Sequence, residues 1–275
     1  MKMKKVLAAF LAGVLAVSMT ACSGGSAKKI ESPDDFEGAK ISVQTATTAH
    51  DNIQAMLDEG KKIEVLPYEK VTQCFDDLDL GRVDAVYVDS VVAAYYLTGE
   101  DSKFEKVWTS VEGEPKGICL KKGNTDLKAI IEAAIDTLYY NGKMGEIATA
   151  HFGSNVTEGV RTVTEEPVLD LSALKTITDG KLTVGMEIGY PPMEYMDETG
   201  LNPMGFDVDI ANALGELLGL EVELVNTAWD GIFAGLDKDQ YDMIISSVSI
   251  TPDRQAAYEL TEPYVSNQLV IVTKK

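Results

Sequence analysis

Basic residues are scarce in this chain. Its 275 residues include 24 Lys and Arg against 44 Asp and Glu, which gives a formal net charge of −20. A nucleic-acid partner is disfavoured, because phosphate contacts need clustered Lys and Arg. The acidic balance fits a soluble protein in an extracellular setting.

Histidine and cysteine are also few. There are two His, His50 and His151, and three Cys, with no CxxC pair. Without metal-ligand spacing we expect neither a metal site nor a cofactor. The residue counts allow a Ser/His/Asp triad, but no G-x-S-x-G motif supports one.

The apolar run near the start, Val6 to Val17, is too short to span a bilayer as a mature helix. A basic start precedes it, and Met19-Thr20-Ala21-Cys22 and a Gly/Ser stretch follow. This pattern resembles a bacterial lipoprotein signal, although Met19 stands where such signals usually have Leu. The alternative is an ordinary secretory signal with a chance Cys. The resemblance implies a signal peptide over residues 1–21, lipidation of Cys22, a tether over residues 22–37 and anchoring to the outside of the cell membrane.

The other two cysteines are predicted to be buried. Cys74 shares one helical face with Val71, Phe75 and Leu78, and Cys119 lies in a short strand-like run. Free buried thiols are common, and a bridge between the two is the alternative in an oxidising compartment.

Strand-like and helix-like segments alternate along the chain, which favours a mainly parallel α/β sheet. The pattern begins at Lys40 and restarts at Lys181. The expected strands are 40–44, 62–66, 83–88, 181–187, 221–226 and 241–245, and the expected helices are 49–59, 72–80, 90–97, 207–218 and 232–236.

A faint repeat links the two stretches. Phe75, Leu78, Val83 and Asp84 match Phe233, Leu236, Tyr241 and Asp242 without a gap. In this register Asp89 falls opposite Ser247, and both follow a strand, where open α/β sheets bind ligands. Any two βαβ units can share such a pattern, but it suggests two similar lobes around a cleft.

One predicted wall of this cleft follows the strand that ends at Ile245. Ser246, Ser247 and Ser249 supply hydroxyls, and Thr251 and Pro252 are suited to start a helix. Arg254 lies in the first turn, where a cation opposes the helix dipole and therefore favours an anionic partner. Its planar guanidinium can hold a carboxylate. The alternative is a surface Arg on a capped helix.

The other predicted wall follows the strand that ends at Gln44. Thr47 and Thr48 lead into a helix, with Thr48 expected as the N-cap. Asp89 adds a lone negative charge suited to an ammonium group. The two walls together describe an α-amino acid zwitterion.

Three residues are expected at the side-chain end of that ligand, namely Glu187, Tyr190 and Trp229. Aromatic residues in loops after strands can stack on a ligand or a cation. Packing beneath the cleft is the alternative for Trp229. Asp84, Asp207, Asp209 and Asp242 are expected to be caps and turn formers.

Several motifs resemble the extracellular solute-binding proteins of polar amino-acid ABC transporters. The segments like that family's first lobe are Gly189-Tyr190-Pro191-Pro192-Met193-Glu194-Tyr195, Gly205-Phe206-Asp207-Val208-Asp209, Trp229-Asp230-Gly231 and Ser249-Ile250-Thr251-Pro252-Asp253-Arg254. The segments like its second lobe are Thr47-Thr48-Ala49 and Gly81-Arg82-Val83-Asp84-Ala85-Val86-Tyr87-Val88-Asp89.

The resemblance implies a two-lobed α/β fold of the periplasmic-binding-protein type and a role for each residue. Arg254 would clamp the ligand carboxylate with help from Ser249 and Thr48. Asp89 and the Ser246–Ser247 region would take the ammonium, while Tyr190, Trp229 and Glu187 would surround the side chain. One departure is Ala46, where the family often has Gly.

The order of the lobes departs from the family, because the segment like its second lobe comes first. We interpret this as a circular permutation, which is tolerable when a surface connection is opened. The expected domains are one lobe over 38–118, the other over 119–153 and 181–275, and a linker over 154–180 that joins the family's old termini. A single intact connection between the lobes is expected, with the chain ends near the hinge.

The function implied by the resemblance is capture of a polar amino acid by a monomer that delivers it to an ABC permease, without catalysis. A dehydratase-like enzyme on the same scaffold is an alternative, for which Glu187 is the only obvious general acid. A sensory amino-acid receptor is another. Ligand identity is left open.

Overall fold

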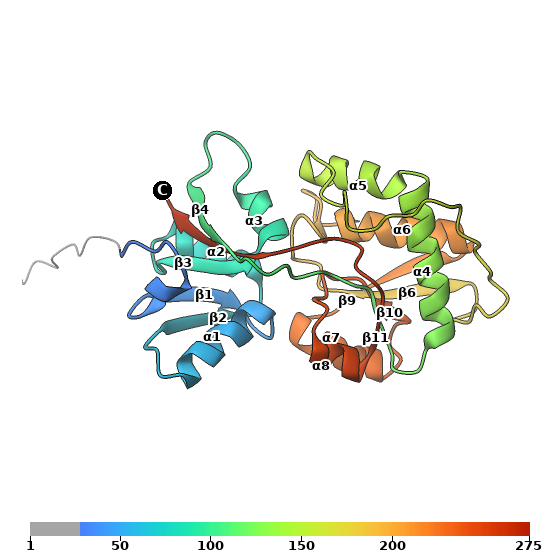
Figure 1. The fold of residues 1–275 in the computed structure, drawn as a ribbon, viewed down its shortest axis with the longest axis horizontal. Coiled ribbons are helices and arrows are strands. Elements are labelled where there is room, and N and C mark those ends of the chain that lie inside the picture. Colours follow the sequence, from blue (N-terminus) through green and yellow to red (C-terminus); the bar gives the residue numbers. More distant parts are fainter. Residues whose placement is uncertain (1–27) are drawn as a thin grey trace, which may run out of the picture.

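The computed structural model describes residues 28–275, so the predicted signal segment 1–21 and Cys22 lie outside the described residues. The described chain forms two α/β lobes joined by two connecting segments of the chain (Figure 1). We call residues 28–109 and 269–275 the N-terminal lobe, residues 119–260 the central lobe, and residues 110–118 and 261–268 the hinge segments. The predicted two-lobed α/β fold is confirmed.

The N-terminal lobe is built on a five-stranded sheet of order β2-β1-β3-β12-β4. Its elements are η1 (Pro33–Phe36), β1 (Lys40–Gln44), α1 (Thr48–Asp58), β2 (Glu64–Tyr68), α2 (Val71–Asp79), β3 (Ala85–Asp89), α3 (Ser90–Tyr96), β4 (Phe104–Thr109) and β12 (Leu269–Lys274). β1 pairs in parallel with β2 and β3, whereas β12 is antiparallel to β3 and β4. β3 is buried along its whole length, as expected for a strand covered on both faces.

The central lobe has a second five-stranded sheet, of order β11-β5-β10-β6-β9. Its elements are β5 (Cys119–Leu120), α4 (Thr125–Tyr140), α5 (Lys143–Phe152), β6 (Lys181–Met186), β7 (Tyr195–Met196), β8 (Pro203–Met204), α6 (Phe206–Leu218), β9 (Glu221–Asn226), α7 (Trp229–Asp237), β10 (Met243–Ile244), α8 (Pro252–Ala257) and β11 (Glu259–Leu260). β6 is parallel to β9 and β10. α6 ends at Leu218, as the sequence predicted, and Gly219 follows it in the left-handed conformation that often terminates a helix.

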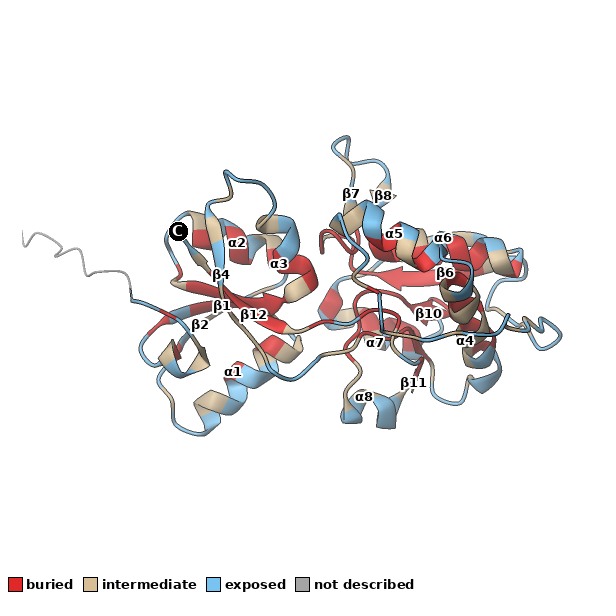
Figure 2. Cartoon of the chain, turned by 45° about the horizontal axis from the view of Figure 1, so that its top comes forward, coloured by how far each residue is buried: buried red, intermediate tan, exposed pale blue. Residues whose placement is uncertain are grey.

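Each lobe has its own apolar interior, and Figure 2 shows buried residues concentrated in the central strands of both. In α2 the buried residues are Val71, Cys74, Phe75 and Leu78, which recur at the predicted helical spacing. Within residues 28–275, no helix combines the length and the apolar character needed to cross a membrane.

The two buried cysteines are free thiols, as the first interpretation predicted. Cys74 lies on α2 in the N-terminal lobe and Cys119 on β5 in the central lobe. Burial raises the pKa of each thiol to about 12. Neither thiol therefore has the thiolate character that reactivity requires.

The prediction that residues 181–275 lie in one lobe is wrong for β12. This strand pairs with β3 and β4 on either side, so both edges of its backbone are hydrogen-bonded within the N-terminal lobe. The chain therefore crosses between the lobes twice, and the predicted single connection is also wrong. The two hinge segments lie side by side, with Lys116 N donating to Val265 O at 3.0 Å and Tyr264 N donating to Lys116 O at 2.9 Å.

The chain ends do not lie at the hinge. Lys275 N donates to Lys103 O at 2.9 Å, and residues 28–31 and 273–275 line one surface hollow of the N-terminal lobe. Figure 1 places Lys275 and the first described residues on the side of this lobe that faces away from the central lobe. The prediction that the C-terminal end lies near the hinge is therefore wrong.

Candidate functional site

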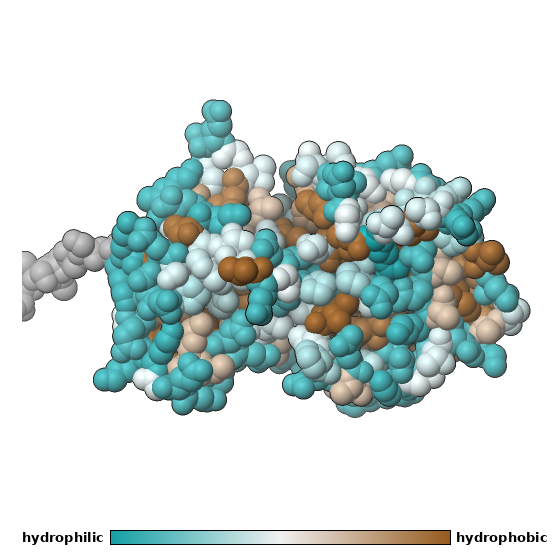
Figure 3. All heavy atoms as spheres, viewed as in Figure 1, coloured by the Kyte–Doolittle hydropathy of each residue, from teal (hydrophilic) through white to brown (hydrophobic). Residues whose placement is uncertain are grey.

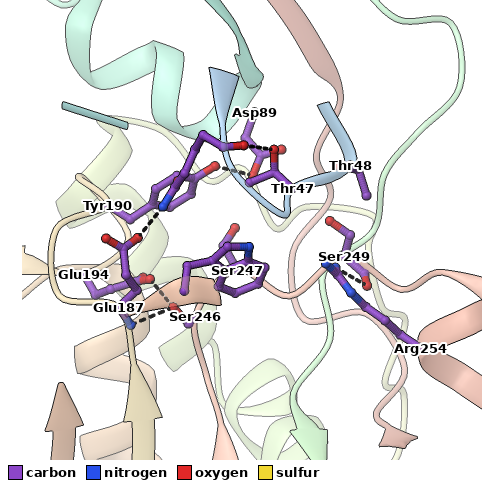
Figure 4. A pocket seen from close by; sticks show the side chains of 12 residues that line it. Thr47, Thr48, Asp89, Glu187, Tyr190, Glu194, Ser246, Ser247, Ser249 and Arg254 are labelled. Carbon is purple, nitrogen blue, oxygen red and sulfur yellow. Dashed lines mark hydrogen bonds between the residues drawn. The ribbon is translucent and has the colours of Figure 1, made fainter. Parts of the chain in front are cut away.

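A cavity of about 310 Å³ lies between the lobes, beyond the carboxyl ends of several strands. Figure 3 shows the narrow groove along which the lobes meet. The cavity is lined by Gln44, Thr47, Thr48, Asp89, Glu187, Tyr190, Glu194, Trp229, Ser246, Ser247, Ser249 and Arg254. All ten residues predicted for ligand binding are in this lining, and they converge from both lobes (Figure 4). Their roles toward a ligand stay predictions.

Arg254 lies in the first turn of α8, whose N-cap is Thr251 as predicted. Its Nη1 donates to Ser249 O at 3.1 Å, and the guanidinium carbon lies 5.5 Å from the ring centre of Trp229 and 5.1 Å from that of Phe233. Burial lowers the pKa of this guanidinium. No ion pair formed within residues 28–275 includes it. The cavity therefore presents a cation without a protein counter-charge.

Opposite Arg254 is the start of α1. The N-cap is Thr47, whose Oγ1 accepts from His50 N at 3.3 Å, so the prediction of Thr48 as the cap is wrong. Ala46 precedes it with a φ of 59°, a left-handed conformation that moves the helix start one residue earlier than predicted. This φ also gives a physical reason for Gly at that position. Thr48 Oγ1 donates to Glu114 Oε1.

Asp89, the last residue of β3, is not the lone anion that the sequence predicted. Lys116 Nζ lies 3.0 Å from each of its oxygens. Oδ1 also accepts from Asn267 Nδ2 at 2.8 Å, and Oδ2 from the Tyr190 hydroxyl at 2.8 Å. Burial raises the pKa of Asp89 to about 6, and Lys116 opposes that rise.

Lys116, Glu114 and Asn267 come from the hinge segments, and sequence reasoning missed all three. Lys116 Nζ donates to Glu114 Oε2 at 2.8 Å and to Ser249 Oγ at 2.9 Å. Burial opposes ionisation of Glu114, but Lys116 and its hydrogen bonds lower its pKa to about 2. The only sequence signal was a charged Glu114-x-Lys116 pair just before the crossing strand near Gly117.

Three hydrogen bonds join the lobes across the cavity. Gln44 Nε2 donates to Glu187 Oε2 at 3.0 Å, Trp229 Nε1 to Ala46 O at 2.9 Å, and Tyr190 to Asp89. Burial raises the pKa of Glu187 to about 7, against the hydrogen bond from Gln44. The lobes are therefore closed on each other in this structure.

The floor of the cavity is a buried polar network around Ser246 and Ser247. Ser246 Oγ accepts from Glu187 N at 3.0 Å and donates to Glu194 Oε1 at 2.5 Å. Burial and the neighbouring Asp207 raise the pKa of Glu194 well above its ordinary value. Ser247 has a φ of 49°, and neither its Oγ nor Glu194 Oε2 has a hydrogen-bond partner within residues 28–275. Both atoms are buried polar groups in the floor of the cavity.

Asp84, Asp207 and Asp242 bond to the backbone of distant segments and are not the caps and turn formers that the sequence predicted, whereas Asp209 lies in the first turn of α6. Asp207 accepts from Ser247 N at 2.8 Å and from the Tyr264 hydroxyl, and Asp242 accepts from Thr183 N at 2.8 Å. Asp84 accepts from Lys40 N at 2.8 Å. Glu194, which lies in the Gly189–Tyr195 segment, was not predicted as a site residue, because its bond to Ser246 joins positions 52 apart in the sequence.

Comparison with known proteins agrees with this geometry. Residues 182–275 match the family model described as bacterial extracellular solute-binding proteins, family 3. The L-cystine-binding protein TcyA of Bacillus subtilis is 38% identical over 96 residues, covering 35% of each chain. The L-cystine-binding protein TcyJ of Escherichia coli is 32% identical over 133 residues, covering 46% of this chain and 50% of TcyJ. The chain thus spans half or less of the length of these relatives.

A solved structure with similar sequence is a putative ABC transporter binding component from Wolinella succinogenes complexed with lysine. It is 41% identical over 29% of this chain and 34% of that chain, with a TM-score of 0.28.

Proposed function

We propose that this chain, whose residues 182–275 match the family model of the bacterial extracellular solute-binding proteins of family 3, binds a polar L-amino acid between its lobes and delivers it to an ABC permease. The observation that carries this proposal is Arg254. Its guanidinium lines the cavity and has no carboxylate partner within residues 28–275. A half-buried cation of this kind favours an anionic ligand, and its fork matches a carboxylate.

The other lining residues receive roles that agree with this orientation. Thr48 and Ser249 flank the carboxylate, and Glu187 is at the opposite end, beside Tyr190. Ser247 Oγ, which lacks a partner within the described chain, is placed to receive the α-ammonium near Asp89. Glu187 suits a side chain that carries a hydrogen-bond donor.

A thermal-shift screen of the twenty amino acids tests the proposal. A ligand that binds only the folded state stabilises it by RT ln(1 + [L]/Kd), about 2.7 kcal/mol at a hundred times Kd. We expect a subset of polar amino acids to raise Tm, and Arg254→Ala to abolish the shift. No shift with any amino acid at millimolar concentration contradicts the proposal.

A second candidate is an enzyme of the dehydratase type. The observation that favours it is a pair of cavity carboxyls, Glu187 and Glu194, whose raised pKa values would keep a proton available near neutral pH. Turnover of prephenate or arogenate that is lost in Glu194→Gln would establish it. Amino-acid binding without turnover of either compound would favour simple capture.

We also propose that Cys22 carries a lipid and that the protein acts as a monomer at the outer face of the cell membrane. Both walls of the cavity come from one chain, so a single copy completes the site. Membrane fractionation of the wild type and Cys22→Ser tests the anchor, since only the wild type should sediment with membranes. Light scattering of the purified protein tests the monomer.

We still propose a circular permutation, but with the chain opened at a different connection from the one predicted. The ends lie together on the N-terminal lobe, so the opened connection is on that lobe and both hinge segments are retained. A chain in which Lys275 is joined to Ile30 and the 154–180 segment is cut should fold and bind the same ligand. A circular chain, joined at the same place but not cut in the 154–180 segment, is the control. The proposal is contradicted if neither the relinked chain nor this circular chain folds.

A further inference from the structure

Lys116 is a fully buried cation behind the wall of the cavity. Its side chain is 1% exposed, and its backbone pairs with Ser249 on one side and Val265 on the other. The three ammonium protons are all used, by Asp89 at 3.0 Å, Glu114 at 2.8 Å and Ser249 Oγ at 2.9 Å. Lys116 thus contacts Asp89, which is predicted to bind the ligand ammonium, and Ser249, which is predicted to help bind the ligand carboxylate.

Three protein donors already bond to the carboxylate of Asp89. A carboxylate offers about four lone-pair sites. Lys116 contacts both oxygens, Asn267 Nδ2 contacts Oδ1 and the Tyr190 hydroxyl contacts Oδ2. A ligand ammonium would therefore meet a carboxylate that a protein cation already neutralises.

Because of this arrangement, a ligand that lacks an ammonium group loses less binding free energy than it would at an unpaired carboxylate. A site whose buried carboxylate pairs only with the ligand rejects an analogue that lacks the ammonium, because the carboxylate is left unpaired. Here Asp89 keeps Lys116 whatever the ligand carries. The remaining charge of the cluster resides on Glu114, which also accepts from Thr48 and from Asn267 at 2.7 Å. A neutral hydroxyl on the ligand can still bond to Ser247 Oγ, which has no partner within residues 28–275.

We propose that Lys116 is a specificity-determining residue that supplies the cation for Asp89 from within the protein, so that the cavity binds α-hydroxy carboxylates about as tightly as the α-amino acids with the same side chain. The inference rests on the proposed function, since it assumes a carboxylate on Arg254. It adds a ligand class, the α-hydroxy acids, and assigns the selectivity to a residue outside the cavity lining.

Calorimetry with matched pairs tests the proposal. The pairs are L-arginine with argininic acid, L-methionine with its α-hydroxy analogue, L-phenylalanine with L-phenyllactate and L-alanine with L-lactate. For each pair that binds the wild-type protein, we expect the two Kd values to agree within about tenfold, a difference of less than 1.4 kcal/mol. A wild-type preference for the amino acid of about a hundredfold or more overturns the proposal.

The variants isolate the charge. Lys116→Met combined with Glu114→Gln removes one positive and one negative charge, so the net charge of the cluster is unchanged and the fold is expected to survive. This variant should prefer the amino acid by at least about tenfold more than the wild type, because Asp89 then needs the ligand ammonium. Lys122→Met, which removes an exposed lysine paired with Glu259, is the control and should keep the wild-type ratio. An unchanged ratio in the double variant, with circular dichroism showing a folded protein, also overturns the proposal.

Different outcomes would overturn the role of Lys116 and the proposed function. A wild type that strongly prefers amino acids, with binding lost in Arg254→Ala, overturns the role of Lys116 and leaves the proposed function standing. A wild type that binds no member of either series, or binding that Arg254→Ala leaves intact, overturns both.

Discussion

Replacing Arg254 by Ala should remove most ligand binding while leaving the fold almost unchanged. The guanidinium has five N–H donors, and only one bonds to the protein, Nη1 to Ser249 O at 3.1 Å. The others are available to a ligand. Two charge-assisted bonds of about 1.5–3 kcal/mol each give roughly 3–6 kcal/mol, or about two to four orders of magnitude in Kd.

The contribution of Arg254 to folding is much smaller. It has no ion pair within residues 28–275, and its other contacts are the faces of Trp229 and Phe233. The free energy of unfolding without ligand should therefore fall by no more than about 1 kcal/mol. Arg254→Lys keeps the charge but loses the fork, so its affinity should lie between those of the wild type and Arg254→Ala.

Titration calorimetry with the best amino acid from the thermal screen measures the binding, and urea unfolding measures the stability. Arg82→Ala is the matched control, because this arginine pairs with Asp77 at 2.9 Å on the surface of the N-terminal lobe. Its ligand affinity should equal that of the wild type. A Kd for Arg254→Ala within about threefold of the wild-type value would refute the reasoning, since a carboxylate clamp cannot be that weak.

Three further predictions concern packing, pH and thiols. Gly185→Ala should destabilise the protein by about 1–3 kcal/mol in urea unfolding, because its Cβ would lie 2.5 Å from the Tyr241 ring. Gly231→Ala is the control and should be neutral or slightly stabilising, because no atom lies within 4 Å of its Cβ. The folded state raises the pKa of Glu187 from 4.5 to about 7, so folding takes up a proton and stability should fall as pH rises through that window, by at most about 1.4 kcal/mol per pH unit. Glu187→Gln should have a shallower slope, since the raised pKa values of Asp89 and Glu194 remain, and an equal slope in both proteins contradicts the assignment. In Cys22→Ser, Cys74 and Cys119 should resist a thiol reagent until the protein is unfolded, so rapid native labelling would contradict their burial.

Local features of the fold and the site were predictable from sequence because they depend on neighbouring residues. The Thr251-Pro252 helix start, the Gly219 helix stop and the spacing of Val71, Cys74, Phe75 and Leu78 all involve contacts within a turn or two. The lining of the cavity was also predictable, since polar residues that follow strands meet at one edge of a sheet.

What the sequence could not reveal depends on distant pairing. Lys116 is 27 positions from Asp89, and Asn267 is 178 positions from it, so no local pattern brings them together. β12 joins the N-terminal lobe because the second hinge segment crosses back, which hydrophobic periodicity does not record. The one-residue error at Thr47 and Thr48 arose because either hydroxyl can cap a helix, and the backbone at Ala46 decides between them.

The position of the chain ends on one lobe limits how movement of this protein can be observed. Residues 28–31 and 273–275 travel together with the N-terminal lobe, so fluorophores attached within these two segments would keep a constant separation whether the lobes open or close. A useful pair needs one label at the ends and one in the 154–180 segment, where Arg161 holds the chain against Asp136 of the central lobe at 2.7 Å. The same arrangement makes that segment the natural insertion point for a fluorescent reporter of ligand concentration.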